Sequence, residues 1–357
     1  MKKFHPLTIV AKRQETRDSV RIALDVPTDL QPDFEFQPGQ HLPIQVDIDG
    51  KRLRRTYSIC SEPGHWPLEI GIRVQPGGQF SEYAAGELSV GDVLDVMPPT
   101  GRFHADVDPG GSKFYLGFAA GSGITPILSI ATSVLNNEPR SRFALFYGNR
   151  KQDSAMFIED LYALKNRYPD RLQLHFVFSR EEQEFAINAG RIDAEKVAEL
   201  HERFCSGDSA DAAYVCGPDT MIRTVVDALR GVGMVEDSIH VERFGAPRRK
   251  PAESSVPDRV ASQGEATVTV IMDGHKKSFD MARDAASIVD AAADNGIELP
   301  YSCKGGVCAT CRTHLRQGDV QMAANYGLEP WELESGFILA CQSRPASDEV
   351  LLDYDKA

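Results

Sequence analysis

The chain has 357 residues, of which 42% are hydrophobic and 25% charged, and its formal net charge is −13. This length suggests two or three globular domains, and the acidic balance argues against nucleic-acid binding, because phosphate contacts need a basic face. No apolar run approaches the roughly 20 residues of a membrane span, and the N-terminus has no signal-like apolar core. We therefore expect a cytoplasmic protein with neither a nucleic-acid nor a membrane partner.

Residues 1–107 consist of short β-rich segments separated by turn residues. Six of these segments are expected to be strands: 7–14, 19–26, 41–48, 54–60, 68–74 and 93–97. Proline and glycine separate them at almost every junction. Six strands in a domain of this size predict a closed antiparallel β-barrel, because closure removes exposed strand edges.

Three features of this barrel are typical of a flavin site. An aromatic ring can stack on a flavin, a neighbouring hydroxyl can reach its N5 edge, and an arginine can pair with a pyrophosphate. Two glycines before a short helix would leave backbone amides beside a phosphate. Each feature is weak alone, and Tyr57 can equally be a half-buried core residue, but their order supports FAD. The candidate residues are Arg55, Tyr57, Ser58, Arg73, Gly78 and Ser81.

Residues 108–245 show compact apolar strands that alternate with helices. The strands are expected at 113–119, 142–148, 172–178 and 212–216, and the helices begin near Thr125, Asp153, Asp193 and Asp219. Asp153 and Asp193 are predicted N-caps, because a carboxylate accepts orphan amides and suits the helix dipole. This alternation predicts a parallel sheet covered by helices on both faces.

A glycine-containing turn between the first strand and helix of this domain suits a nicotinamide coenzyme. Gly121 and Gly123 allow a pyrophosphate to approach the helix N-terminus, and Pro126 fits the first helical turn. Ligands of open parallel sheets bind at the strand ends, where three further segments lie. The full candidate set is Gly121, Gly123, Ile124, Thr125, Pro126, Asn149, Arg150, Ser179, Arg180, Cys216, Gly217, Pro218 and Asp219.

Two of these residues have alternative interpretations. Arg180 can hold a ribose 2′-phosphate and so select NADPH over NADH, or it can be a solvated surface charge. Cys216 can lie near the reacting groups, or it can be a small buried hydrophobic residue.

Residues 246–264 are rich in proline, serine and charge, and they are expected to form a linker, either a swinging or a fixed one. Residues 265–357 follow as a third domain. It begins with two strands around the turn Asp273-Gly274, a strong hairpin signal, and continues with a helix near 287–296. This domain carries a net charge of −7, which fits either ordinary solubility or an acidic docking face for a basic redox partner.

Four of the seven cysteines fall in this last domain. Cys303, Cys308 and Cys311 follow a C-x4-C-x2-C spacing, and Cys341 comes 29 residues later. This is the plant-type pattern of a [2Fe–2S] cluster. Glycines 305 and 306 permit backbone amides to point at the sulfurs. A zinc site is the alternative, but structural zinc favours paired C-x2-C motifs.

The order of these motifs resembles the ferredoxin–NADP reductase superfamily with a fused C-terminal ferredoxin. The stretches RRTYSIC, AAGSGITPIL, VCGPDTM and CKGGVCATC carry the resemblance. The family implies a multidomain fold: an antiparallel FAD-binding β-barrel, an α/β parallel-sheet NAD(P)-binding domain and an α+β β-grasp ferredoxin domain. It places Tyr57, Ser58 and Cys216 at the site of hydride transfer.

More narrowly, the chain resembles reductase subunits of phenylacetyl-CoA 1,2-epoxidases, through PGQHL, YGNR and NYGLEPWELESGFILACQ. These imply FAD, NADPH (with NADH possible), a [2Fe–2S] cluster and a separate oxygenase complex as electron acceptor. We expect electrons to pass from NADPH through FAD and the cluster to that oxygenase. The alternatives are a reductase for a ring-hydroxylating or ketosteroid oxygenase, and a non-enzymatic redox sensor or scaffold.

Overall fold

The computed structural model describes residues 3–205, 207, 209–244 and 264–356. The chain divides into two compact units, of which the first is Phe4–Phe244 and the second contains the C-terminal residues from Gly245. The predicted linker, 246–264, lies outside the described residues except for Gly264. The domain boundary at residue 107 falls inside the first unit and stays a prediction.

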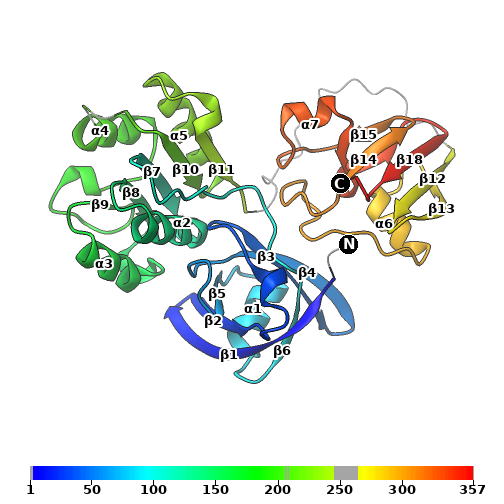
Figure 1. The fold of residues 1–357 in the computed structure, drawn as a ribbon, viewed down its shortest axis with the longest axis horizontal. Coiled ribbons are helices and arrows are strands. Elements are labelled where there is room, and N and C mark those ends of the chain that lie inside the picture. The colour runs from blue at the N-terminus through cyan, green and yellow to red at the C-terminus, as the bar shows by residue number, and fades with distance from the viewer. Residues whose placement is uncertain (1–2, 206, 208, 245–263, 357) are drawn as a thin grey trace. The chain divides into compact units, whose positions relative to one another are not determined.

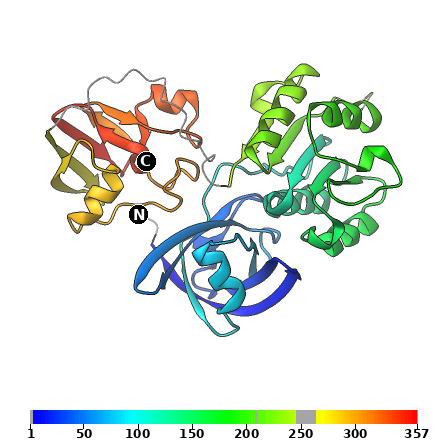
Figure 2. The same ribbon diagram turned by 180° about the vertical axis from the view of Figure 1, so that it is seen from behind.

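The first half of this unit is a six-stranded antiparallel sheet with the order β4-β3-β6-β1-β2-β5. A bridge between Ile59 and Ile70 joins the end of β4 to β5 and closes the sheet, as the sequence predicts. Helix α1 (Gln79–Gly86) lies against the barrel strands (Figures 1 and 2). Its Phe80 and Ala84 side chains are part of the barrel core. The strands are β1 (His5–Thr16), β2 (Ser19–Asp25), β3 (His41–Ile48), β4 (Lys51–Ser58), β5 (Leu68–Arg73) and β6 (Val93–Val96).

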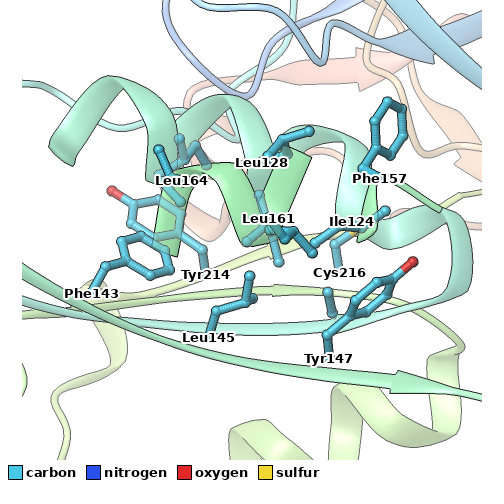
Figure 3. Packing of buried hydrophobic residues seen from close by; sticks show 14 of the residues in the cluster. Ile124, Leu128, Phe143, Leu145, Tyr147, Phe157, Leu161, Leu164, Tyr214 and Cys216 are labelled. Atoms are coloured by element: carbon cyan, nitrogen blue, oxygen red, sulfur yellow. The ribbon is translucent and has the colours of Figure 1, made fainter. Parts of the chain in front are cut away.

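The second half is a five-stranded parallel sheet with the order β11-β10-β7-β8-β9. Helices α2 (Ile124–Asn137) and α3 (Ile158–Arg167) pack on one face, and α4 (Ala194–Phe204) and α5 (Asp219–Gly231) pack on the other. Figure 3 shows the first of these cores. The strands are β7 (Phe114–Ala120), β8 (Arg142–Asn149), β9 (Leu172–Phe178), β10 (Ala212–Cys216) and β11 (Ile239–Glu242).

Three details of this sheet and its helices test the sequence predictions. Asp193 caps α4, since its carboxylate accepts a hydrogen bond from the Lys196 amide at 3.0 Å, as predicted. The prediction that Asp153 caps a helix is wrong, because it lies in the short 3-10 turn Gln152–Ser154 and α3 begins only at Ile158. Strand β11 was not predicted, because it is short, its four residues are half-buried and only two of them are apolar.

The C-terminal unit contains a mixed five-stranded sheet, β13-β12-β18-β14-β16, and a two-stranded sheet, β15-β17. The predicted hairpin is confirmed: β12 and β13 pair around Asp273 and Gly274, whose φ angles are 51° and 74°. Ser287 caps α6 (Ile288–Asp294). The other elements are β12 (Glu265–Met272), β13 (His275–Ala282), β14 (Arg312–Gln317), β15 (Val320–Met322), α7 (Pro330–Glu334), β16 (Phe337–Leu339), β17 (Ser343–Pro345) and β18 (Glu349–Asp353).

This mixed sheet with one helix packed across it is the arrangement expected of a β-grasp domain. Across the described parts of both units, no helix is long and apolar enough to cross a bilayer.

Candidate functional site

The loop between α6 and β14 directs backbone amides at a cysteine sulfur. Lys304, Gly306 and Ala309 have positive φ angles of 49°, 73° and 52°, so the chain reverses direction repeatedly over a few residues. The amides of Gly305 and Cys308 lie 3.3 and 3.5 Å from the Cys303 sulfur. Convergent amides of this kind stabilise anionic sulfur, which is what ligation to iron requires.

The four predicted ligands come together as two pairs. Cys303 contacts Cys308, and Cys311 contacts Cys341, which lies in the short turn Ala340–Gln342. Within the described residues, no group of three or more such side chains lies close enough together to hold a single metal ion. Two pairs of thiols match a cluster of two irons, each of which takes two cysteines. The residues therefore fit a [2Fe–2S] cluster.

Two side chains that the sequence analysis missed also reach the sulfurs. The Thr310 hydroxyl donates to the Cys308 sulfur at 3.2 Å. The Gln342 amide lies 3.8 Å from the Cys341 sulfur and donates to the Lys304 carbonyl at 2.8 Å, so it ties the distant cysteine to the loop. The sequence offers one indication of these two contacts, because Thr310 and Gln342 are each adjacent to a predicted cysteine ligand.

In the barrel, Tyr57 and Arg55 lie two residues apart on β4 and so share a face of the strand. The Tyr57 ring packs against Phe80 with centroids 5.3 Å apart, and burial raises the pKa of its phenol above the usual range. Arg55 is exposed and donates to the Arg54 carbonyl at 2.7 Å, whereas Ser58 is buried. A packed aromatic ring with an exposed arginine beside it fits the isoalloxazine and pyrophosphate of a flavin.

The turn before α1 differs from the expectation in one respect. The Gly77 amide donates to the Glu82 carboxylate at 2.7 Å and the Gly78 amide to the Gln75 carbonyl at 2.8 Å, so neither is available to a phosphate. Ser81 is buried, and its hydroxyl bonds to the backbone of Gln75 and Gly78. The amides that could still bind a phosphate here are those of the first turn of α1, which have no acceptor within the helix. Ser81 therefore shapes the turn.

Arg73 connects the barrel to the glycine-containing turn of the parallel sheet. Its guanidinium donates to Asp18 at 3.0 Å, and its Nη1 would lie 3.1 Å from a Cβ at Gly121. Gly121 itself has a φ of 56°. Arg73 and Gly121, one from each predicted site, thus lie side by side within one unit.

The glycine-containing turn is pressed against the end of β10. A Cβ at Gly123 would overlap the Cys216 carbonyl and lie 3.0 Å from the Gly217 amide. Cys216 is fully buried in the core shown in Figure 3, beside Tyr147 and Ile124. Burial, together with Glu242, raises the pKa of its thiol, so it stays neutral.

A buried amide side chain lies at the end of β8. Asn149 is 8% exposed, and among the described residues its amide nitrogen and oxygen have no hydrogen-bond partner of normal geometry. The nearby Tyr147 hydroxyl donates to the Gly121 carbonyl at 3.0 Å. The Asn149 side chain also interacts with this hydroxyl, but a buried amide has further donors and acceptors to satisfy, so Asn149 fits a coenzyme contact.

The remaining candidates separate into exposed and structural groups. Ser179 and Arg180 pair through their backbones with Asn149 and Arg150, each at 2.9 Å, and both arginines are exposed. Asp219 forms ion pairs with Arg223 and Arg243, at 2.7 and 3.2 Å, and its coenzyme role stays a prediction. The buried residues of the α2 start are Ile124, Thr125 and Pro126, whereas Gly217 is partly exposed and Pro218 exposed.

Comparison with known proteins agrees with this geometry. Three family models match in succession: the oxidoreductase FAD-binding domain at 6–105, the oxidoreductase NAD-binding domain at 118–227 and the 2Fe–2S iron–sulfur cluster binding domain at 270–346. A subunit of the 1,2-phenylacetyl-CoA epoxidase of Escherichia coli (strain K12) is 42% identical over 355 residues, 99% of each chain. The chain belongs to the ferredoxin–NADP reductase-like family with a fused ferredoxin domain.

Other relatives also match this reductase over nearly its whole length. The ferredoxin reductase component of 3-ketosteroid-9-alpha-monooxygenase from Rhodococcus rhodochrous is 32% identical over 359 residues, 98% of this chain and 96% of its own. The solved structure of phthalate dioxygenase reductase matches with a TM-score of 0.62 and 25% identity over 98% of both chains. The reductase is therefore an oxidoreductase with FAD-binding, NAD-binding and [2Fe–2S] domains, as its sequence motifs predict.

Proposed function

We propose that this reductase takes electrons from NADPH and delivers them to the oxygenase component of a phenylacetyl-CoA epoxidase, in the cytoplasm. The observation that carries the proposal is the 42% identity to the Escherichia coli protein of that system over 99% of both chains. The ketosteroid monooxygenase reductases reach 32%. Bound FAD and the cluster would supply the conversion of a two-electron hydride transfer into single-electron steps.

The barrel residues would bind and orient the flavin. Tyr57, fixed against Phe80, provides the stacking surface, and Ser58 lies next to it on β4. Arg55, together with Arg73, would hold the pyrophosphate, because guanidinium groups pair well with phosphate. None of these side chains needs to transfer a proton.

The turn at Gly121–Pro126 would receive the coenzyme pyrophosphate, and the bound coenzyme would give the Asn149 amide a hydrogen-bond partner of normal geometry. Cys216 contributes a small, neutral, fully buried group behind this turn. A neutral, buried side chain at this position excludes water from the coenzyme and places no charge next to the nicotinamide. We assign Cys216 this packing role near the site of hydride transfer.

We assign NADPH preference to Arg180, with Arg150 beside it. Their backbones are hydrogen-bonded at 2.9 Å across the ends of β8 and β9, so two exposed guanidinium groups belong to adjacent positions. A ribose 2′-phosphate is dianionic and suits such a pair.

Steady-state kinetics of Arg180→Ala test this assignment. We expect kcat/KM for NADPH to fall about 10- to 100-fold, because one charge-assisted hydrogen bond to the phosphate is lost. The kcat/KM for NADH should be nearly unchanged. Arg167→Ala, an exposed arginine in the last turn of α3, is the control and should change neither. An unchanged coenzyme preference in Arg180→Ala would disprove the role.

Reconstitution identifies the electron acceptor. The purified reductase is combined with the oxygenase component of either a phenylacetyl-CoA epoxidase or a 3-ketosteroid 9α-monooxygenase, and NADPH-dependent substrate consumption is measured. We expect turnover with phenylacetyl-CoA only. Turnover with the ketosteroid system alone would replace the proposed acceptor.

A further inference from the structure

An exposed apolar surface lies on α7 of the C-terminal unit. Trp331 and Leu333 are 57% and 42% exposed, and no other large hydrophobic side chain among the described residues of this unit is as exposed. An exposed tryptophan is unusual in a monomeric surface and is the residue type most enriched at binding hot spots. The Trp331 surface consists of Glu329, Pro330, Trp331, Leu333, Glu334 and Ser335, which are all exposed.

The inner side of α7 is fixed next to a cluster ligand. Glu332 is fully buried, and its carboxylate forms an ion pair with Arg312 at 2.6 Å. Arg312 directly follows Cys311, and its guanidinium carbon lies 3.7 Å from the centre of the Phe337 ring. Because Glu332 points inward, the flanking residues Trp331 and Leu333 are held outward.

The segment before α7 is fixed to the cluster loop. The Tyr326 amide donates to the Gly306 carbonyl at 2.9 Å, and a Cβ at Gly327 would overlap the Val307 carbonyl. Gly306 and Val307 lie between the first two cysteines of the loop. The Trp331 surface is therefore anchored to the cluster site at two points, and a protein bound to it would approach the cluster.

The charges around this surface favour a basic partner. Glu329 and Glu334 flank Trp331, and no lysine or arginine occurs between residues 317 and 343. Residues 265–357 carry a net charge of −7, and residues 1–245, with 27 basic and 35 acidic side chains, carry −8. The flavoprotein unit thus has the same sign, whereas a separate protein with basic side chains would be complementary.

We propose that the Trp331 surface is the docking site for a separate protein electron acceptor, which presents an apolar patch bordered by basic side chains. Trp331 fills the apolar patch, and Glu329 and Glu334 orient the partner over the cluster loop. This inference rests on the proposed function, because it takes the cluster as the exit for electrons.

The test uses the full-length reductase loaded with FAD and cluster, and variants Trp331→Ala and Glu334→Lys. Asp280→Lys is the control, because Asp280 is an exposed carboxylate on β13, at the opposite edge of the sheet from β14 and β16. Cytochrome c, a basic protein with an exposed haem edge, serves as acceptor, and ferricyanide as one that needs no protein docking. NADPH-driven reduction of each is measured, together with single-turnover reduction of the cluster.

We expect the KM for cytochrome c to rise about tenfold in both variants, as for loss of a hot-spot residue, with ferricyanide reduction and cluster reduction unchanged. Asp280→Lys should behave like wild type. A KM within twofold of wild type in both variants, an equal rise in Asp280→Lys, or slower cluster reduction in Trp331→Ala would each overturn the proposal. Wild-type reductase that reduces cytochrome c but does not support phenylacetyl-CoA turnover would disprove only the proposed acceptor.

Discussion

At the scale of single residues, the sequence identifies the cluster ligands better than the side chains that hydrogen-bond to their sulfurs. The four cysteines could be predicted because thiol chemistry and spacing are both visible in the sequence. Thr310 and Gln342 could not, because only the folded loop brings their polar atoms to the sulfurs. The sequence likewise does not show that the Asp219 carboxylate pairs with two arginines, and its predicted coenzyme contact stays a prediction.

The Thr310 hydroxyl should raise the reduction potential of the cluster, because a hydrogen bond to sulfur stabilises the more negative, reduced state. Thr310→Val removes the donor at 3.2 Å from Cys308 with little change of shape. A net hydrogen-bond contribution of about 0.5–1.5 kcal/mol corresponds to a fall of roughly 20–60 mV for one electron. A redox titration followed by visible spectroscopy measures this value.

Thr313→Val is the matched control for this prediction. Thr313 is fully buried, and its hydroxyl has no hydrogen-bond partner in the part of the chain that the structure describes. Its replacement should leave the potential unchanged. Equal potentials in wild type and Thr310→Val would show that the hydroxyl does not act on the cluster.

At the scale of elements, local patterns predict most strands and helices, and long-range contacts explain the failures. All six barrel strands and four of the five parallel strands follow from apolar periodicity and turn residues. The start of α3 cannot be predicted from local patterns, because the Phe157 amide donates a hydrogen bond to Glu15, 142 positions earlier, at 2.8 Å. Phe157 takes a φ of 59° there, a conformation that no local pattern indicates.

The turn between β7 and α2 should tolerate no side chain at Gly123. In Gly123→Ala the new methyl group meets the Cys216 carbonyl, which is backbone and must move. We expect a loss of at least about 2 kcal/mol in unfolding free energy, with a raised KM for NADPH. Chemical denaturation and steady-state kinetics measure the two effects.

Gly231→Ala, in the last turn of α5, provides the comparison. No described atom lies within 4 Å of its added Cβ, and alanine favours a helix by up to about 1 kcal/mol over glycine. This variant should be as stable as wild type or more so. If Gly123→Ala behaved in the same way, the close approach would not be a constraint.

At the scale of the whole molecule, the flavoprotein unit is held together across its two sheets. Arg21 on β2 is 6% exposed and bonds to Glu15 at 3.1 Å, Glu69 at 3.3 Å and Asp160 of α3 at 3.1 Å. Its guanidinium also lies 4.3 Å from the centre of the Phe157 ring. This contact between barrel and parallel sheet was not predictable, since its members are scattered through the sequence.

Arg21→Met should loosen this connection, because it leaves three carboxylates without their buried cation. We expect the free energy of unfolding of the flavoprotein unit to fall by about 3–5 kcal/mol. The release of flavin during a urea titration measures this loss. Arg13→Met is the control: its side chain is 57% exposed, and its contacts with Glu15 and Asp160 are 3.7 and 3.8 Å long. That loss should stay below about 1 kcal/mol, and equal losses in both variants would contradict the account.

The most direct test of the electron path is an anaerobic titration of the full-length reductase with NADPH, followed by visible and EPR spectroscopy. The account predicts that the flavin bands bleach and that the signal of a reduced [2Fe–2S] cluster then appears. In Cys308→Ser the flavin should still bleach, but no cluster signal should follow. A wild-type protein that carries the cluster without flavin, or whose cluster stays oxidised after the flavin is reduced, would contradict the proposed path from NADPH to the cluster.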